Sequence, residues 1–193
     1  MVQLTGNNLI STAVFISGRG TNLKSLIKFS KKKNSPINIK LIISNTNKAK
    51  GLKYSKAYKI QKKVIDFKNK NIAEKKLLNL LSKKKIRFIC LAGFMKILSK
   101  KFIKKFSGKI VNIHPSLLPK YKGLNTHQKA LKNNDKYSGC TVHYVTKKVD
   151  SGKIILQKKV KIKRNDSLNT LTKKVLLEEH KLYPRAISKV FKN

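Results

Sequence analysis

Acidic side chains are scarce in this chain. Its 193 residues include 7 Asp and Glu against 47 Lys and Arg, which gives a formal net charge of +40 at pH 7. Only four of the basic residues are arginine, and the lysines are spread along the whole chain. Sequence-specific recognition of nucleic acid relies on arginine forks and on clustered basic residues. We therefore favour compositional drift of the surface over a nucleic-acid-binding module, and we expect anionic small-molecule substrates as partners and no specific nucleic acid.

Cysteines and long apolar runs are also rare. Cys90 and Cys140 lie in apolar stretches without metal-ligand spacing, so we expect buried thiols in a reducing compartment and no metal. The longest apolar run, residues 88–95, is far shorter than the roughly 20 residues of a membrane-spanning helix. The first residues lack the cationic and apolar segments of a secretory signal. These absences predict a soluble, cytoplasmic protein that does not associate with membranes.

Apolar runs typical of strands alternate with amphipathic segments typical of helices. The predicted strands are 12–16, 37–43, 62–67, 86–92 and 109–114, and the predicted helices between and after them are 21–32, 50–59, 72–85, 99–106 and 126–133. Two further strands, 138–146 and 153–162, precede a long helix at about 167–191. This order predicts an α/β fold with a mostly parallel, Rossmann-like sheet flanked by helices. It also predicts an antiparallel hairpin addition near the C-terminus, all within a single domain, 1–193.

The stretch SGRGTNL, residues 17–23, directly follows the first predicted strand and opens a helix. Gly18 and Gly20 permit a tight backbone there, and a helix N-terminus offers free N–H groups to a phosphate. The alternative is a plain turn in which Thr21 or Asn22 caps the helix. We favour the phosphate site because ligands bind at the carboxyl ends of strands in such sheets.

The stretch VNIHPSLLPKYKG, residues 111–123, ends an apolar strand on two polar side chains. Asn112 and His114 share one face of the strand because side chains alternate, and the prolines that follow end the strand. An asparagine amide can donate to a developing oxyanion, and a histidine can transfer a proton near neutral pH. Taken singly, the histidine could be a core group and the asparagine a turn residue. Their convergence at a strand end favours a catalytic site.

Three acids have more than one interpretation. Asp150 precedes Ser-Gly and is either a turn former or a carboxylate that orients His114. Glu178 and Glu179 lie in the last predicted helix, where a solvated face is the default and a carboxylate directed into a cleft is the alternative. Composition and spacing do not choose between these roles.

Six motifs occur in an order that resembles the phosphoribosylglycinamide formyltransferases, the folate-dependent enzymes of purine synthesis. They are SGRGTNL, LAGFMKIL, NIHPSLLPKYKG, GCTVHYV, VDSGKIILQ and EEHKLYPRAI, and the resemblance covers residues 12–191 approximately. The resemblance implies the formyltransferase fold. It also implies transfer of a formyl group from 10-formyltetrahydrofolate, as co-substrate, to the glycyl amine of phosphoribosylglycinamide. We expect a monomer or a homodimer.

The resemblance also implies roles for particular residues. The catalytic residues would be Asn112, His114 and Asp150. The ribonucleotide phosphate would lie on Gly20, Thr21 and Asn22, with Glu179 at the ribose or glycinamide end. The folate would contact Lys70, Met95, Lys96, Ile97, Leu98 and Asn112.

The chain departs from the family pattern at several places. Lys122 stands where proline is usual, Lys96 where arginine is usual, and Ser151-Gly152-Lys153 where the family has Gly-Gly-Pro. We expect these changes to affect the loops around the folate.

Two related enzymes fit the sequence less well. Methionyl-tRNA formyltransferase needs a further carboxyl-terminal domain. Formyltetrahydrofolate hydrolase usually has an amino-terminal regulatory domain and lacks the SGxGTN turn.

Overall fold

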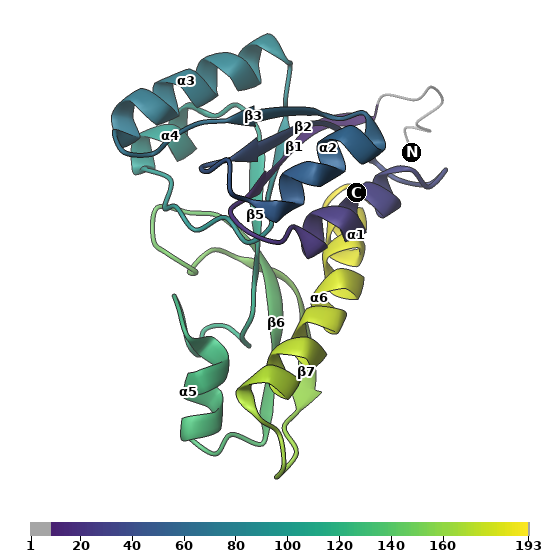
Figure 1. Cartoon of the computed structure of the whole chain (residues 1–193), viewed down its shortest axis with the longest axis vertical. Helices are drawn as coiled ribbons and strands as arrows, with labels where there is room; N and C mark the ends of the chain where they lie inside the picture. The colour runs from purple at the N-terminus through teal and green to yellow at the C-terminus, as the bar shows by residue number, and fades with distance from the viewer. Residues whose placement is uncertain (1–8, 193) are drawn as a thin grey trace.

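The computed structural model describes residues 9–192, and within that range the strands join one seven-stranded sheet (Figure 1). The strand order is β3-β2-β1-β4-β5-β6-β7. The bounds are β1 (Ile10–Ile16), β2 (Ile37–Ser44), β3 (Gln61–Val64), β4 (Phe88–Leu91), β5 (Lys109–His114), β6 (Tyr137–Tyr144) and β7 (Ile154–Lys161). The first five strands are parallel, whereas β6 and β7 run antiparallel to their neighbours.

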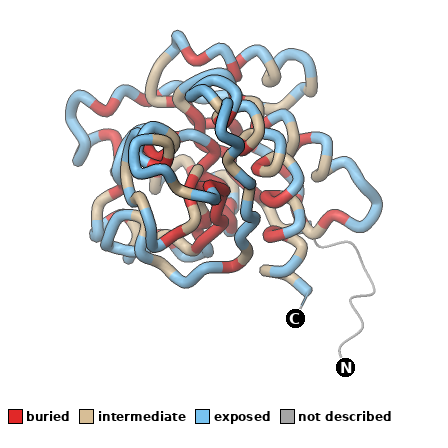
Figure 2. The backbone as a smooth tube through the Cα atoms, turned by 90° about the horizontal axis from the view of Figure 1, so that it is seen from below, coloured by how far each residue is buried: buried red, intermediate tan, exposed pale blue. Residues whose placement is uncertain are grey.

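Helices cover both faces of this sheet. They are α1 (Thr21–Ser30), the short 3-10 helix η1 (Lys50–Leu52), α2 (Lys53–Tyr58), α3 (Lys70–Lys83), α4 (Lys100–Lys105), α5 (Thr126–Lys132) and α6 (Leu168–Val190). One apolar core lies between the sheet and α1 and α6, and the other lies between the sheet and α3 and α4. Figure 1 shows these two pairs of helices on opposite sides of the strands, and Figure 2 shows the buried backbone gathered in the middle of the molecule.

The alternation of side chains along β5 decides which face of the sheet carries Asn112 and His114. Val111 and Ile113 pack in the core against α1 and α6, whereas Ile110 packs in the core against α3 and α4. Burying one such aliphatic side chain is worth about 1.5–3 kcal/mol, so a one-residue slip of the register is strongly disfavoured. Alternation then directs Asn112 and His114 to the α3–α4 side, at the carboxyl end of the strand.

The structure confirms the mostly parallel α/β sheet with its antiparallel hairpin near the C-terminus. The third strand is shorter than predicted and ends at Val64. The alternative that Thr21 or Asn22 caps α1 is wrong: the N-cap is Gly20, and no side chain caps the helix. Within residues 9–192, none of the helices combines the length and apolar character needed to cross a membrane. The expectation that the chain begins without a secretory signal concerns residues 1–8, which lie outside the described range.

Candidate active site

The end of β5 and the loop after β6 bring an amide, an imidazole and a carboxylate together. His114 Nδ1 lies 3.3 Å from Asp150 Oδ2. Asn112 is on the same strand face two residues earlier and lies opposite His143 of β6. Asp150 Oδ1 is in turn 3.5 Å from His143 Nε2. The three residues expected to be catalytic therefore meet in one cluster, and His143 joins them.

Both ring nitrogens of His114 face oxygen acceptors. Nε2 lies 2.9 Å from the carbonyl oxygen of Tyr121, and Nδ1 faces the Asp150 carboxylate. A neutral imidazole has one N–H group and would leave one of these contacts as two facing acceptors. The doubly protonated imidazolium has an N–H group for each oxygen. These two oxygen partners hold the ring of His114 in one orientation.

His143 orients Asn112. The Nδ1 atom of His143 lies 2.9 Å from the carbonyl oxygen of Tyr144, so Nδ1 carries the proton and donates it. In a neutral ring Nε2 is then an acceptor, and Asn112 Nδ2 donates to it over 3.2 Å. This contact uses one of the two N–H groups of the Asn112 amide and leaves the other free to donate.

Asp150 is held as a carboxylate. Burial alone would raise its pKa, but the neighbouring His143 ring, the Gly123 N–H group and the charge of His114 together hold the pKa below its ordinary value. The Gly123 N–H group donates to Asp150 Oδ2 over 2.9 Å. Asp150 itself has a positive φ of 47°, which is uncommon for a residue other than glycine. The turn thus directs this carboxylate towards both histidines.

The predicted phosphate turn has an uncapped helix N-terminus. Gly20 has φ 72° and packs against Gly51, so a Cβ atom on Gly20 would lie 2.6 Å from the Gly51 Cα atom. The Gly51 N–H group also donates to the Gly18 carbonyl oxygen over 2.9 Å. Because no side chain caps α1, its first N–H groups remain available to an anion.

Asn22 turns away from the cap position and contacts α6. Its Nδ2 atom donates to Glu179 Oε2 over 2.6 Å, and both residues are buried. Asn22 Oδ1 is buried with no hydrogen-bond partner in the part of the chain that the structure describes. Burial raises the pKa of Glu179 to about 6, against the lowering effect of the Asn22 hydrogen bond. The residues expected at the two ends of the ribonucleotide thus form one polar pair beside the α1 N-terminus.

The residues expected to contact the folate differ in accessibility. Met95, Lys96 and Ile97 are exposed in the loop between β4 and α4, and Met95 and Ile97 expose 63% and 64% of their surface. The Leu98 side chain is buried in the core against α3 and α4. Lys70 is the exposed first residue of α3. The apolar part of this predicted folate surface is therefore Met95 and Ile97, and Leu98 supports it from below.

The loop of Met95 begins beside Asn112. Leu91, the last residue of β4, pairs with Asn112 of β5, so the two strand ends lie next to each other. Ligands of open α/β sheets bind at this carboxyl edge. An amide donor, an imidazolium and a carboxylate beside an apolar loop and an anion-binding helix end can together hold an acyl donor and an anionic acceptor.

Comparison with known proteins agrees with this geometry. The formyl transferase family matches residues 10–187. The chain belongs to the formyl transferase family. The phosphoribosylglycinamide formyltransferase of Haemophilus influenzae is 42% identical over 178 residues, which cover 91% of this chain and 84% of that protein. The crystal structure of the Brucella melitensis phosphoribosylglycinamide formyltransferase matches with a TM-score of 0.90 at 40% identity, and covers 95% of this chain and 96% of that one.

A longer relative of the formyl transferase family matches over part of its length. The human trifunctional purine biosynthetic protein adenosine-3 is 44% identical over 181 residues, which cover 92% of this chain. The chain spans 18% of the length of that protein. The similarity therefore concerns one segment of the human protein.

Sequence reasoning missed His143 as a member of this cluster. It lies in the motif GCTVHYV, where it reads as an interior residue of a strand. The signal that could have identified His143 is the alternation of polar and apolar side chains along β6. Thr141 and His143 alternate with the apolar Cys140 and Val142, which places both polar side chains on the face opposite the α1–α6 core.

Proposed function

We propose that this chain transfers a formyl group from 10-formyltetrahydrofolate to the glycyl amine of phosphoribosylglycinamide. The products are the N-formyl ribonucleotide and tetrahydrofolate. The single observation that carries the proposal is the meeting of Asn112, His114 and Asp150 at the carboxyl end of β5. The family membership and the uncapped N-terminus of α1 support it.

The chemistry begins when the glycyl amine attacks the formyl carbon and the formyl oxygen becomes an oxyanion. The free N–H group of Asn112 donates to this oxygen, and the His114 imidazolium stabilises the negative charge from the same strand face. One preorganised donor of this kind is worth about 3 kcal/mol of barrier. The bond from the formyl carbon to the folate nitrogen then breaks.

Proton transfer completes the reaction. The amine loses one proton on forming the amide, and the folate nitrogen gains one as it leaves. Asp150 starts as the ionised carboxylate beside His114 and the Gly123 N–H group, so it can accept the amine proton through water and return it to the leaving nitrogen. The proton count therefore balances without a metal or a further reactant.

The substrates occupy the two halves of the site. The ribonucleotide phosphate lies on the N–H groups after Gly20, and its ribose or glycinamide end reaches the Asn22–Glu179 pair. The folate lies on Met95–Leu98 and Asn112, with Lys70 and Lys96 near its anionic end. Both substrates are small anions that the positive field attracts, and we place the reaction in the cytoplasm, carried out by a monomer or a homodimer.

Substitution of the two strand-end residues tests the proposal. We expect Asn112→Ala and His114→Ala each to lower kcat at least about 100-fold, because each removes a group that acts on the oxyanion. Calorimetric affinity for phosphoribosylglycinamide should stay close to that of the wild type. The matched control is Asn38→Ala, which removes an exposed asparagine from the opposite end of β2. Near-normal turnover of either strand-end variant would contradict the catalytic assignment.

An absorbance assay of folate deformylation separates transfer from hydrolysis. The proposal requires that tetrahydrofolate is formed only when phosphoribosylglycinamide is present. Deformylation at full rate without the ribonucleotide would show a hydrolase instead.

A further inference from the structure

Ser17 lies between the two loops that the proposed function assigns to the two substrates. It is the first residue after β1 and the first of the SGRGTNL turn. On one side the chain continues into Gly18 and Gly20 of the phosphate turn. On the other side Ser17 contacts the loop after β4, which carries Met95.

Three hydrogen bonds fix Ser17 in this place. Its N–H group donates to the Gly93 carbonyl oxygen over 3.0 Å. Its hydroxyl oxygen accepts from the Met95 N–H group over 2.8 Å. The same hydroxyl donates its proton to the side-chain oxygen of Asn45, just after β2. The ends of β1, β2 and β4 are therefore joined through one hydroxyl group.

The loop that carries Met95 has few other anchors near that residue. Phe94 is buried against Phe15 and Phe67, and Leu98 is buried further on. Between these two anchors Met95, Lys96 and Ile97 are exposed. The Ser17 hydroxyl is thus what holds the Met95 backbone against the end of β1.

We infer that Ser17 is a positioning residue: it fixes the position of the folate-binding loop, residues 95–97, relative to the ribonucleotide turn that contains Gly18 and Gly20. The inference rests on the proposed function of those two loops. Removal of the hydroxyl leaves the Met95 N–H group and the Asn45 side chain without this hydrogen-bond partner. The exposed segment 95–97 is then no longer held in a fixed position relative to the sheet. The phosphate turn keeps its own support, which comes from the contacts of Gly18 and Gly20 with Gly51.

Three variants test the inference. Ser17→Ala removes the hydroxyl, and Asn45→Ala removes only the group that orients it. The matched control is Ser55→Ala, which removes a half-buried serine hydroxyl that donates to the Ile60 carbonyl oxygen over 2.7 Å, on α2. For each protein, calorimetry measures the affinity for tetrahydrofolate and, separately, for phosphoribosylglycinamide. Hydrogen exchange measures the protection of the Met95 amide.

We expect Ser17→Ala to weaken tetrahydrofolate binding about fivefold, the usual effect of losing one such hydrogen bond, and to speed exchange at Met95. Asn45→Ala should act in the same direction with a smaller effect, and it carries the test if Ser17→Ala does not fold. The ribonucleotide affinity of both variants and all properties of Ser55→Ala should match the wild type.

Unchanged tetrahydrofolate affinity in both variants, or an equal loss for both ligands, would overturn the inference and leave the proposed function standing. A wild-type protein that binds neither ligand would overturn both, so the two failures are distinguishable.

Discussion

Glu179 is a carboxylic acid in a place where its charge is poorly solvated, because α1 and α6 pack together around it. Burial raises its pKa from 4.5 to about 6, so between these values the folded chain binds more protons than the unfolded chain. The stabilising contribution of this group is complete below the unfolded pKa and is lost as the pH rises through the folded pKa. The ionised Glu179 carboxylate present at neutral pH therefore lowers the stability of the fold.

Replacement of Glu179 by glutamine should remove this pH dependence. We expect the difference in unfolding free energy, Glu179→Gln minus wild type, to increase by about 2 kcal/mol as the pH rises through the window between the two pKa values. Denaturant unfolding at a series of pH values measures the gain. Glu178→Gln is the matched control, since its carboxylate bonds Lys181 on the surface of the same helix. An equal pH trend in both variants would exclude the buried carboxylate as the cause.

The residues of the site were predictable from the sequence to different degrees. Asn112 and His114 interrupt an apolar strand with period two and precede a proline, which is a local pattern. Asp150 came from the family resemblance, because a carboxylate in a turn has no local signature of catalysis. The pairing of His143 with Asn112 depends on the register between β5 and β6, and register is a long-range property that a local pattern does not give.

At the scale of elements, two loops that depart from the family pattern contact each other. Lys122 Nζ donates to Ser151 Oγ over 2.8 Å, and the neighbouring Gly123 N–H group donates to Asp150. Proline and glycine are usual at positions 122 and 151. The side chains of Lys122 and Ser151 therefore join the loop after β5 to the loop after β6, directly beside the Asp150 carboxylate.

A double-mutant cycle measures this link between the loops. We expect Lys122→Ala and Ser151→Ala to interact by about 0.5 kcal/mol in unfolding free energy, the low end for an intramolecular hydrogen bond, because both side chains are exposed. Lys148→Ala, an exposed lysine of the second loop, is the control for loss of charge. Additive effects of the two substitutions would show that the contact does not join the loops.

The order and type of the elements were predictable, whereas the start of α1 was not. Apolar periodicity placed each strand and helix within a few residues of its observed position. A cap by Thr21 or Asn22 was the alternative to a phosphate site, because such side chains usually accept from the first turn. Asn22 instead donates to Glu179, which is 157 residues away in sequence. A tertiary partner thus outcompetes a local cap, and it leaves the helix end free for a ligand.

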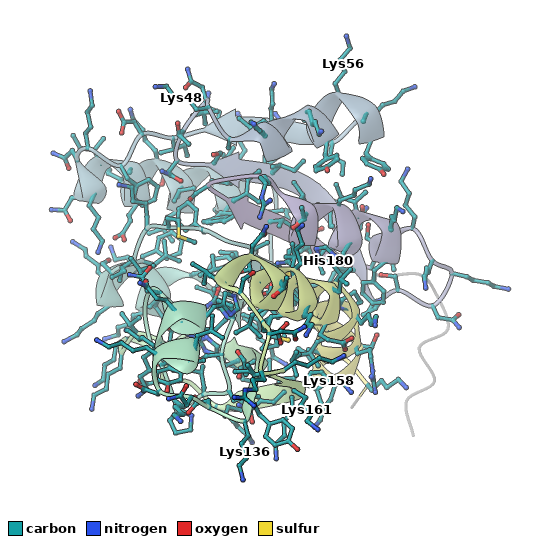
Figure 3. The ribbon with its side chains drawn as sticks, turned by 60° about the horizontal axis from the view of Figure 1, so that its bottom comes forward. Lys48, Lys56, Lys136, Lys158, Lys161 and His180 are labelled. Atoms are coloured by element: carbon teal, nitrogen blue, oxygen red, sulfur yellow. The ribbon has the colours of Figure 1, made fainter. Side chains whose placement is uncertain are left out.

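Across the whole molecule, lysine has an identifiable structural use at the edges of the sheet. The two edge strands, β3 and β7, carry the adjacent pairs Lys62–Lys63 and Lys158–Lys159. Charged side chains on an edge strand oppose pairing with a second chain. Figure 3 shows Lys48 and Lys56 pointing outwards at one end of the molecule and Lys136 at the other. Lysines therefore lie on both edges of the sheet and at opposite ends of the molecule.

This distribution predicts how the protein responds to salt. A basic patch shaped for nucleic acid would hold duplex DNA at physiological ionic strength, whereas scattered lysines give weak binding that ends once counterions compete. Fluorescence anisotropy with a labelled DNA duplex should show binding at low salt that is lost by about 0.2 M NaCl. In the same series the KM values of both anionic substrates should rise, because screening weakens their attraction to the positive surface. Tight DNA binding that survives this salt would mean that the +40 charge serves a polyanionic partner and is not the product of drift.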